Sequence, residues 1–414
     1  MGLLQPQNKK ESTLQEKANE LELSPLFNVS LANKELFHSN FLAWLGESYP
    51  KLFLKLMSDV LEKELEISTK IRIEREYHNF DIAVFETGED HGCLKLIIEN
   101  KVKSIPSLGQ LQLYESRLKQ QSGNQVVCVL LSISADFHDS QINIEKTNWH
   151  FVDYKKLSSS LLTLSGKEVE NHYHAELIKD YCSYIDNLQY VIDAICDIHT
   201  NDDYFYHDST RDLIEGLRIN DICGKRRMQA ASLQLKNLFQ KDNILMVNKS
   251  TDLKSKERRT QVGFSFTNAM PLLEARFKTH DDEYILVQIQ GKQYRHCIEF
   301  FDVPGGDLIS KQAKGARPSE KGIQMIKEKY PDIFFGTESL KNYPNFKDKK
   351  FGQRGAEQGY CKYCNGSILG SNSSHPGRIS CFVYQWVEIP DNSSISELVR
   401  AVHEDILNLM SLIF

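Results

Sequence analysis

A chain of 414 residues is longer than one ordinary hydrophobic core, so its length predicts two or three domains. Hydrophobic residues make up 41% and charged residues 26% of it, which is typical of a globular protein and excludes a disordered or fibrous one. The net charge of -6 and the isoelectric point of about 6.1 argue against a wholly basic nucleic-acid coat protein. A nuclease is not excluded, because it needs only a local positive groove.

Two further features of the composition bear on the compartment. No apolar run approaches the ~18 residues of a membrane span, and the first residues lack the charged and apolar regions of a signal peptide. We therefore expect a cytoplasmic protein. The chain has nine cysteines, an odd number, which favours reduced thiols or a metal cluster over a disulfide framework.

The first half alternates between helical and strand patterns. Apolar residues recur at helical spacing through residues 11–65. Strand patterns follow over 70–77, 81–85, 95–101, 125–133 and 149–154, with a helix at about 108–118 between the third and the fourth. Gly88 and Gly92 mark the turn between the second and third strands. This order predicts an α/β layer with a central mixed sheet.

The second half predicts a separate α+β domain. A helical region over residues 158–201 ends at a patch of acidic and aromatic residues, 202–206, so we place the boundary between domains of residues 1–200 and 201–414. Beyond it the pattern predicts a helix over 213–239, then three strands, then an amphipathic C-terminal helix from Ser396 that packs or dimerises. The predicted strands cover residues 262–267, 272–278 and 284–290.

The residues that carry chemistry lie on the second and third predicted strands. Asp81 begins one, and Glu99, Asn100 and Lys101 end the next. Since side chains alternate along a strand, Glu99 and Lys101 point the same way while Asn100 points away and offers its backbone carbonyl. Hard oxygen ligands suit Mg²⁺ or Mn²⁺, and the lysine can orient or help deprotonate an attacking water.

These residues resemble the motif of the PD-(D/E)XK nuclease superfamily. Gln110 and Tyr114 are similar to its Gln-x-x-x-Tyr element, one helical turn apart on one face. The segment 35–45 is similar to the first helix of a branch of uncharacterised bacterial members with an E-x-x-H-S pattern, in which the early Glu joins the metal site. The resemblance covers about the first 155 residues, and Phe80 stands where the family has proline.

The resemblance implies a restriction-endonuclease-like fold and a set of site residues. The implied catalytic residues are Asp81, Glu99, Lys101, Gln110 and Tyr114. The implied ligands of Mg²⁺ or Mn²⁺ are Asp81, Glu99, the carbonyl of Asn100, and Glu35 as a fourth or second-site ligand. The alternative is an ordinary exposed hairpin with solvated charges. We expect His38, one helical turn after Glu35, to be structural.

The function that follows is a metal-dependent DNA nuclease in bacterial restriction or antiviral defence, acting as a homodimer or with a partner protein. That role rests on family analogy. Two alternatives stay open: an RNA-cleaving toxin with the same site, and a catalytically silent scaffold or binding subunit. Intact Asp81, Glu99 and Lys101 speak against the silent subunit.

Two further groups lie in the second half. Four soft ligands, the number that a closed zinc site needs, are Cys361, Cys364, His375 and Cys381. Their gaps do not match the common spacings of zinc ligands, and a Cys-x-x-Cys also arises by chance. Basic residues that could contact phosphates are Lys254, Lys256, Arg258, Arg259, Lys349, Lys350 and Arg354. Most such clusters are solvated loop faces, and both of these contain an acid.

Overall fold

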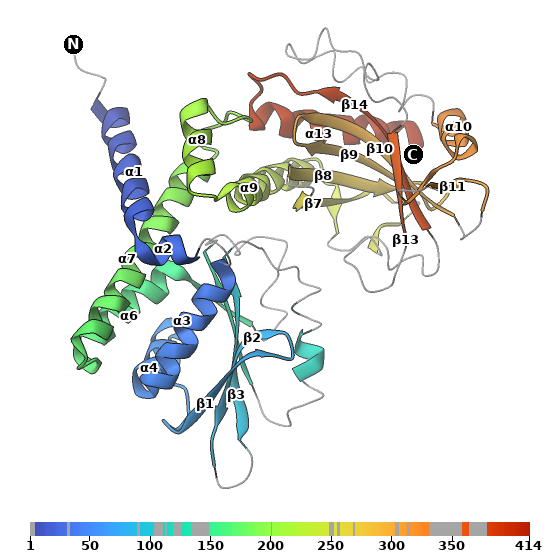
Figure 1. Ribbon diagram of the computed structural model, residues 1–414. Helices are drawn as coiled ribbons and strands as arrows, with labels where there is room; N and C mark the ends of the chain where they lie inside the picture. Colours follow the sequence, from blue (N-terminus) through green and yellow to red (C-terminus); the bar gives the residue numbers. More distant parts are fainter. Residues whose placement is uncertain are drawn as a thin grey trace. The chain divides into compact units, whose positions relative to one another are not determined.

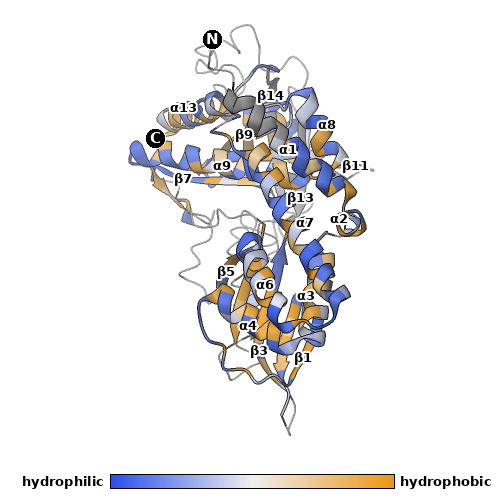
Figure 2. Cartoon of the chain, turned by 90° about the vertical axis from the view of Figure 1, so that its left-hand side faces the viewer, coloured by the Kyte–Doolittle hydropathy of each residue, from blue (hydrophilic) through white to orange (hydrophobic). Residues whose placement is uncertain are grey.

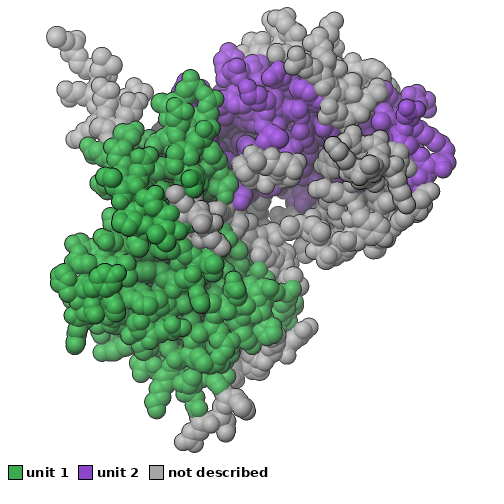
Figure 3. Space-filling model, in the orientation of Figure 1, with its two compact units in different colours: residues 1–196, 208–223 green, residues 197–207, 224–414 purple. Residues whose placement is uncertain are grey.

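Figure 1 shows the computed structural model of the chain. It describes residues 5–30, 34–88, 92–102, 111, 114–118, 126–133, 149–199, 201–247, 252–254, 257–267, 270–302, 306–312, 315–330, 358–363 and 379–414. The chain forms two compact units, residues 1–196 with 208–223 and residues 197–207 with 224–414 (Figure 3). It therefore passes between the units three times, whereas the sequence analysis placed a single boundary after residue 200.

The first unit is built from helices around one sheet. Its helices are α1 (Gln5–Leu23), α2 (Pro25–Ser30), α3 (Lys34–Ser48), α4 (Pro50–Leu61), α6 (Tyr154–Glu168), α7 (His172–Cys196), α8 (Asp208–Gly216) and the first turn of α9 (Asn220–Lys241). Local sequence sets several of their ends. Pro50 begins α4, where no amide hydrogen is needed, and Glu62 ends it in the left-handed region with φ 52°. Asp153 caps α6 by accepting the Lys156 amide at 2.6 Å.

The sheet of this unit has five strands in their sequence order. They are β1 (Ile71–Tyr77), β2 (Phe80–Glu86), β3 (Cys93–Lys101), β4 (Val127–Ser132) and β5 (Trp149–Asp153). The first three pair antiparallel, and β3, β4 and β5 pair parallel. The predicted α/β class with a central mixed sheet is confirmed, and the arrangement is that of a restriction-endonuclease-like fold.

The hairpin between β1 and β2 is fixed by its turn. His78 and Asn79 both have positive φ, 50° and 71°, as the two-residue turns that match the twist of a hairpin require. The turn pairs Tyr77 with Phe80. This register decides which residues face each other farther along the hairpin.

Both faces of the sheet are covered. On one face, α3 approaches closely at Gly46, where a Cβ would overlap the side chain of Ile73. On the other, Ala83, Ile97 and Leu130 pack with the helical segment that carries Tyr114. Hydrophobic colours run along the strands in Figure 2. A charged side chain at the end of β3 is therefore placed beside a packed core.

The second unit contains a seven-stranded sheet in the order β13-β14-β10-β9-β8-β7-β6. Its strands are β6 (Leu245–Met246), β7 (Arg259–Thr267), β8 (Met270–Lys278), β9 (Tyr284–Gln290), β10 (Gln293–Asp302), β13 (Gln358–Tyr363) and β14 (Ile379–Glu388). A smaller pair, β11 (Ile309–Gln312) and β12 (Gly315–Pro318), precedes α10 (Glu320–Lys329). The sequence analysis predicted β7, β8 and β9 but missed β10 and β14. In β10, polar residues such as Arg295 and Glu299 interrupt the apolar alternation.

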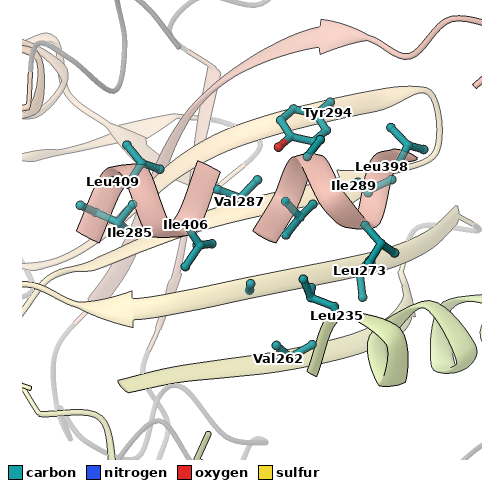
Figure 4. Close-up of a cluster of buried hydrophobic side chains, with 14 of the residues drawn as sticks. Leu235, Val262, Leu273, Ile285, Val287, Ile289, Tyr294, Leu398, Ile406 and Leu409 are labelled. Atoms are coloured by element: carbon teal, nitrogen blue, oxygen red, sulfur yellow. The ribbon is translucent and has the colours of Figure 1, made fainter. Parts of the chain in front are cut away.

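The C-terminal helix α13 (Ile395–Ile413) packs on one face of this sheet (Figure 4). It begins with a capping box: the Ser394 hydroxyl accepts the Glu397 amide at 3.1 Å, and the Glu397 carboxylate accepts the Ser394 amide at 3.2 Å. Its apolar stripe is buried at Leu398, Val402 and Ile406. Of the two roles predicted for this helix, the structure provides the packing one. Across the described residues, the helices are all too short or too polar to pass through a bilayer.

Candidate active site

Two neighbouring strands bring the predicted catalytic residues together. The strand register pairs Ile82 of β2 with Ile98 of β3, so Asp81 lies opposite Glu99 one step farther along. Alternation then places Asp81, Glu99 and Lys101 on one face of the sheet, and Asn100 on the other. Asp81 is further fixed because its Oδ2 accepts the backbone amide of Asn100 at 2.6 Å.

The Glu99 carboxylate is the most buried charge of the group, at 2% exposed. Its Oε1 accepts from the Lys101 ammonium at 2.7 Å and from the Tyr114 hydroxyl at 3.4 Å. Its Oε2 is also buried and has no hydrogen-bond partner among the described residues. A buried carboxylate oxygen without a partner is costly, so this atom is suited to a cation.

The electrostatics of the site agree with that geometry. Burial raises the pKa of Glu99 to about 7, the Lys101 charge opposes this rise, and the Asp81 charge adds to it. Burial also raises the pKa of Asp81, against the lowering effect of the Asn100 amide and of Lys101. For Lys101, burial would lower the pKa, but the charge and hydrogen bond of Glu99 outweigh it and the pKa is raised. The site thus holds two carboxylates whose charged forms are destabilised by burial, and a lysine that stays protonated.

Glu35 lies in the first turn of α3 and acts on the same site. Its charge contributes to the raised pKa values of Asp81, after burial, and of Lys101, after Glu99. In the part of the chain that the structure describes, no group of three or more His, Cys, Asp or Glu side chains is arranged to hold a metal ion. Mg²⁺ often binds through only one or two carboxylates and keeps several waters. The pair Asp81 and Glu99 fits that ion.

The structure adds Glu76, which the sequence analysis did not single out. Its neighbours pair as Arg75 with Ile82 and Tyr77 with Phe80, which places Glu76 opposite Asp81 at the end of β1. It adopts φ 55°, a conformation that L-residues rarely adopt, and its charge contributes to the raised pKa of Asp81 after burial. The two-residue turn was the signal that could have revealed it, because a turn at 78–79 fixes the partner of Asp81.

His38 has the structural role that we expected. It is fully buried, with Nδ1 at 2.9 Å from the Tyr181 hydroxyl and Nε2 at 3.3 Å from the Tyr184 hydroxyl. Its ring stacks on Tyr184 with centroids 5.5 Å apart. Both ring nitrogens are thus used within the core.

The structure describes only some of the remaining predicted residues. Gln110, Lys256, Lys349, Lys350, Arg354, Cys364 and His375 lie outside the described residues. Lys254 and Arg259 both pair with Glu257, and Arg258 is exposed. Neutralisation by Glu257 weakens this cluster as a phosphate site, and its nucleic-acid role stays a prediction.

The zinc prediction concerns β13 and β14. The register pairs Cys361 with Cys381, and Cys381 is fully buried and disulfide-bonded. The six cysteines 93, 128, 182, 196, 223 and 297 are not disulfide-bonded, as expected of reduced cysteines, whereas Cys381 departs from that expectation. A disulfide sulfur is not a thiolate ligand, so a zinc site here would require Cys381 to be reduced. The zinc site stays a prediction.

Comparison with known proteins agrees with the geometry of the first unit. No curated protein and no solved structure shows significant similarity to the chain. A family model described as "PD-(D/E)XK nuclease superfamily" matches residues 26–183, which include β1 to β5 and the four residues Glu35, Asp81, Glu99 and Lys101. Over these residues, the chain is similar to the PD-(D/E)XK nuclease superfamily.

Proposed function

We propose that the first unit hydrolyses phosphodiester bonds of DNA and requires Mg²⁺ or Mn²⁺. The observation that carries this proposal is the Glu99 carboxylate, which is 2% exposed and whose Oε2 has no hydrogen-bond partner in the described part of the chain. The match to a nuclease superfamily supports it. A structural carboxylate at this depth would be expected to have both oxygens occupied.

The residues that would hold the ion are Asp81, Glu99 and the backbone carbonyl of Asn100, with Glu35 as a further ligand. When bound, the cation would supply positive charge to the phosphate oxygens and lower the pKa of a bound water. The cation would also offset the charge repulsion between Asp81 and Glu99, since the Asp81 charge adds to the burial that raises the pKa of Glu99.

Lys101 would orient the attacking water. Its ammonium lies 2.7 Å from Glu99 Oε1 and its pKa is raised, so it stays protonated and donates hydrogen bonds. Of the two roles that the sequence left open, orientation of the water is therefore favoured over its deprotonation. Tyr114 donates to the same oxygen at 3.4 Å and, with Gln110, would orient the phosphodiester backbone.

The wider role is proposed by analogy with bacterial members of the superfamily: restriction or antiviral defence in the cytoplasm, as a homodimer or with a partner protein. The second unit would serve recognition, assembly or regulation. RNA is the alternative substrate, because the cleavage chemistry is the same for both polymers and the 2′-hydroxyl is read elsewhere.

The test is a cleavage assay on supercoiled plasmid, linear duplex, single-stranded DNA and structured RNA, with Mg²⁺, Mn²⁺ or EDTA. Lys101→Ala should lower the rate by about 100-fold and still bind the metal. Lys95→Ala is the matched control, because Lys95 lies on the same strand and pairs with Glu86 at 3.1 Å. It should cleave like the wild type.

Metal-dependent cutting that Lys101→Ala loses and Lys95→Ala keeps would establish the nuclease. The substrate that is cut would decide between DNA and RNA. Cutting by both variants at the wild-type rate would refute the role of Lys101. If the wild type cuts none of the substrates, the nuclease proposal fails in favour of the silent binding subunit.

A further inference from the structure

The side chain of Asn100 occupies a position where the sequence pattern calls for an apolar residue. It follows Leu96 and Ile98 on the face of β3 opposite the acids, and all three side chains are buried. Asn100 itself is 0% exposed. An amide at this depth is costly unless its donors and acceptor are satisfied.

The amide is fully used, and its partners come from two helices. Its Nδ2 donates to the Glu35 carbonyl at 3.0 Å and to the Ser39 hydroxyl at 3.2 Å, both on α3. Its Oδ1 accepts from the hydroxyl of Tyr154, the first residue of α6. Ser39 closes the set by donating to the same Glu35 carbonyl at 3.0 Å.

The same residue also reaches the catalytic face through its backbone. The Asn100 amide donates to Asp81 at 2.6 Å, and its chain neighbours are Glu99 and Lys101. One residue therefore touches Asp81 with its backbone and the backbone of Glu35 with its side chain. Close substitutes would lose part of this set: leucine has no donors, aspartate would bury an uncompensated charge, and glutamine is one methylene longer.

We propose that Asn100 is a positioning residue that fixes the first turn of α3, and with it Glu35, against the strand end that carries Glu99 and Lys101. Tyr154 supports this role by holding the side-chain amide of Asn100 in one orientation. The network acts on the metal site from the opposite side of the sheet, without touching the substrate. This inference rests on the proposed function, since it concerns the residues proposed to hold the cation.

Tyr154 and Tyr181 allow a matched comparison. Both hydroxyls are fully buried in one aromatic cluster around His38, whose ring centroid lies 5.0 Å from that of Tyr154 and 5.6 Å from that of Tyr181. The Tyr154 hydroxyl donates to Asn100, whereas the Tyr181 hydroxyl contacts His38. Tyr154→Phe and Tyr181→Phe each remove one buried hydroxyl and should destabilise the fold to a similar degree.

The experiment measures Mn²⁺ affinity by electron paramagnetic resonance of the free ion, alongside the free energy of unfolding and the cleavage rate. Tyr154→Phe and Asn100→Leu should weaken Mn²⁺ binding by about tenfold, as loss of a supporting contact to a metal site typically does. Tyr181→Phe should bind Mn²⁺ like the wild type. The cleavage rate at limiting metal should fall only in the first two variants, and excess Mn²⁺ should restore part of it in Tyr154→Phe.

Equal Mn²⁺ affinity in Tyr154→Phe and Tyr181→Phe would overturn the inference and leave the network a purely structural one. The Mn²⁺ affinity of Asn100→Leu is interpreted only if its unfolding curve shows that the variant is folded. If Asn100→Leu does not fold, the affinity of Tyr154→Phe decides the inference. If the wild type binds Mn²⁺ but cuts no nucleic acid, the proposed nuclease function is refuted. The Mn²⁺ affinities of the variants still test the positioning role. A wild type that binds no Mn²⁺ would overturn the positioning role.

Discussion

Each unit contains a buried glutamate on a sheet strand, and the two glutamates differ in how their carboxylate oxygens are hydrogen-bonded. In the second unit, Glu299 of β10 is 0% exposed and both of its oxygens are occupied. Its Oε1 accepts from the Ser380 hydroxyl at 2.5 Å and its Oε2 from the Arg276 guanidinium at 3.1 Å. In the first unit, Glu99 is almost as buried, yet one oxygen lacks a partner within the described residues.

We propose that this difference separates a structural charge, Glu299, from a functional one, Glu99. Burial would lower the pKa of Arg276, but Glu274 and Glu299 outweigh it and the pKa is raised, as in a compensated ion pair. Among the described residues, Glu99 has one cationic partner, Lys101, and burial outweighs that charge, so the pKa of Glu99 rises to about 7. A folded chain tolerates such an incompletely paired carboxylate where a ligand will pair with it.

The largest effect that tests this difference is expected when each glutamate is neutralised in turn. Glu99→Gln should lower the cleavage rate by at least about 100-fold, because it removes a proposed ligand of the cation. Asp81→Asn should do the same. Glu299→Gln should keep the wild-type rate under conditions where it is folded. Rates are measured on the substrate that the wild type cuts best, and a fully active Glu99→Gln would refute the site.

The free energy of unfolding should show the opposite pattern, with the larger loss in Glu299→Gln. Glu299→Gln should lower the free energy of unfolding of the second unit by about 4 kcal/mol, since it leaves the buried Arg276 with one charged partner fewer. Hydrogen exchange in β9 and β10 should become faster, while β2 and β3 are unaffected. Glu99→Gln should not destabilise the first unit. Slower exchange or no change in β10 of Glu299→Gln would mean that this pair is not structural.

The raised pKa of Glu99 predicts a dependence of stability on pH in the absence of metal. The folded state holds the proton up to about pH 7, whereas the unfolded carboxyl releases it near 4.5. Stability from this group is therefore fully present below pH 4.5 and is lost as the pH rises to about 7, by up to about 3 kcal/mol. Glu99→Gln should lack this loss. Thermal unfolding of both proteins in EDTA across this range measures it, and parallel curves would contradict the prediction.

A divalent cation should remove part of that loss. At about ten times its dissociation constant, Mg²⁺ or Mn²⁺ should stabilise the first unit by about 1.4 kcal/mol above pH 7. The same ion should leave Glu99→Gln nearly unchanged, and it should leave exchange in the second unit unchanged in both proteins. A shift of equal size in wild type and Glu99→Gln would place the ion elsewhere.

The sequence by itself was sufficient for features that depend on short-range geometry. Strand alternation put Glu99 and Lys101 on one face and Asn100 on the other, and helical periodicity predicted α7 and α13. The α/β class followed from the order of the elements. In the second unit, the same reasoning missed β10, because the polar face of a buried strand hides its periodicity.

Tertiary structure alone decided what each buried polar group contacts. Only the packed fold left one oxygen of Glu99 without a partner among the described residues and joined Asn100 to Glu35 and Tyr154. These contacts join residues up to 65 positions apart in the chain. Local pattern gives the direction of a side chain, but burial and the choice of partner depend on elements that meet only when the chain folds, so the chemistry of the site is set by packing.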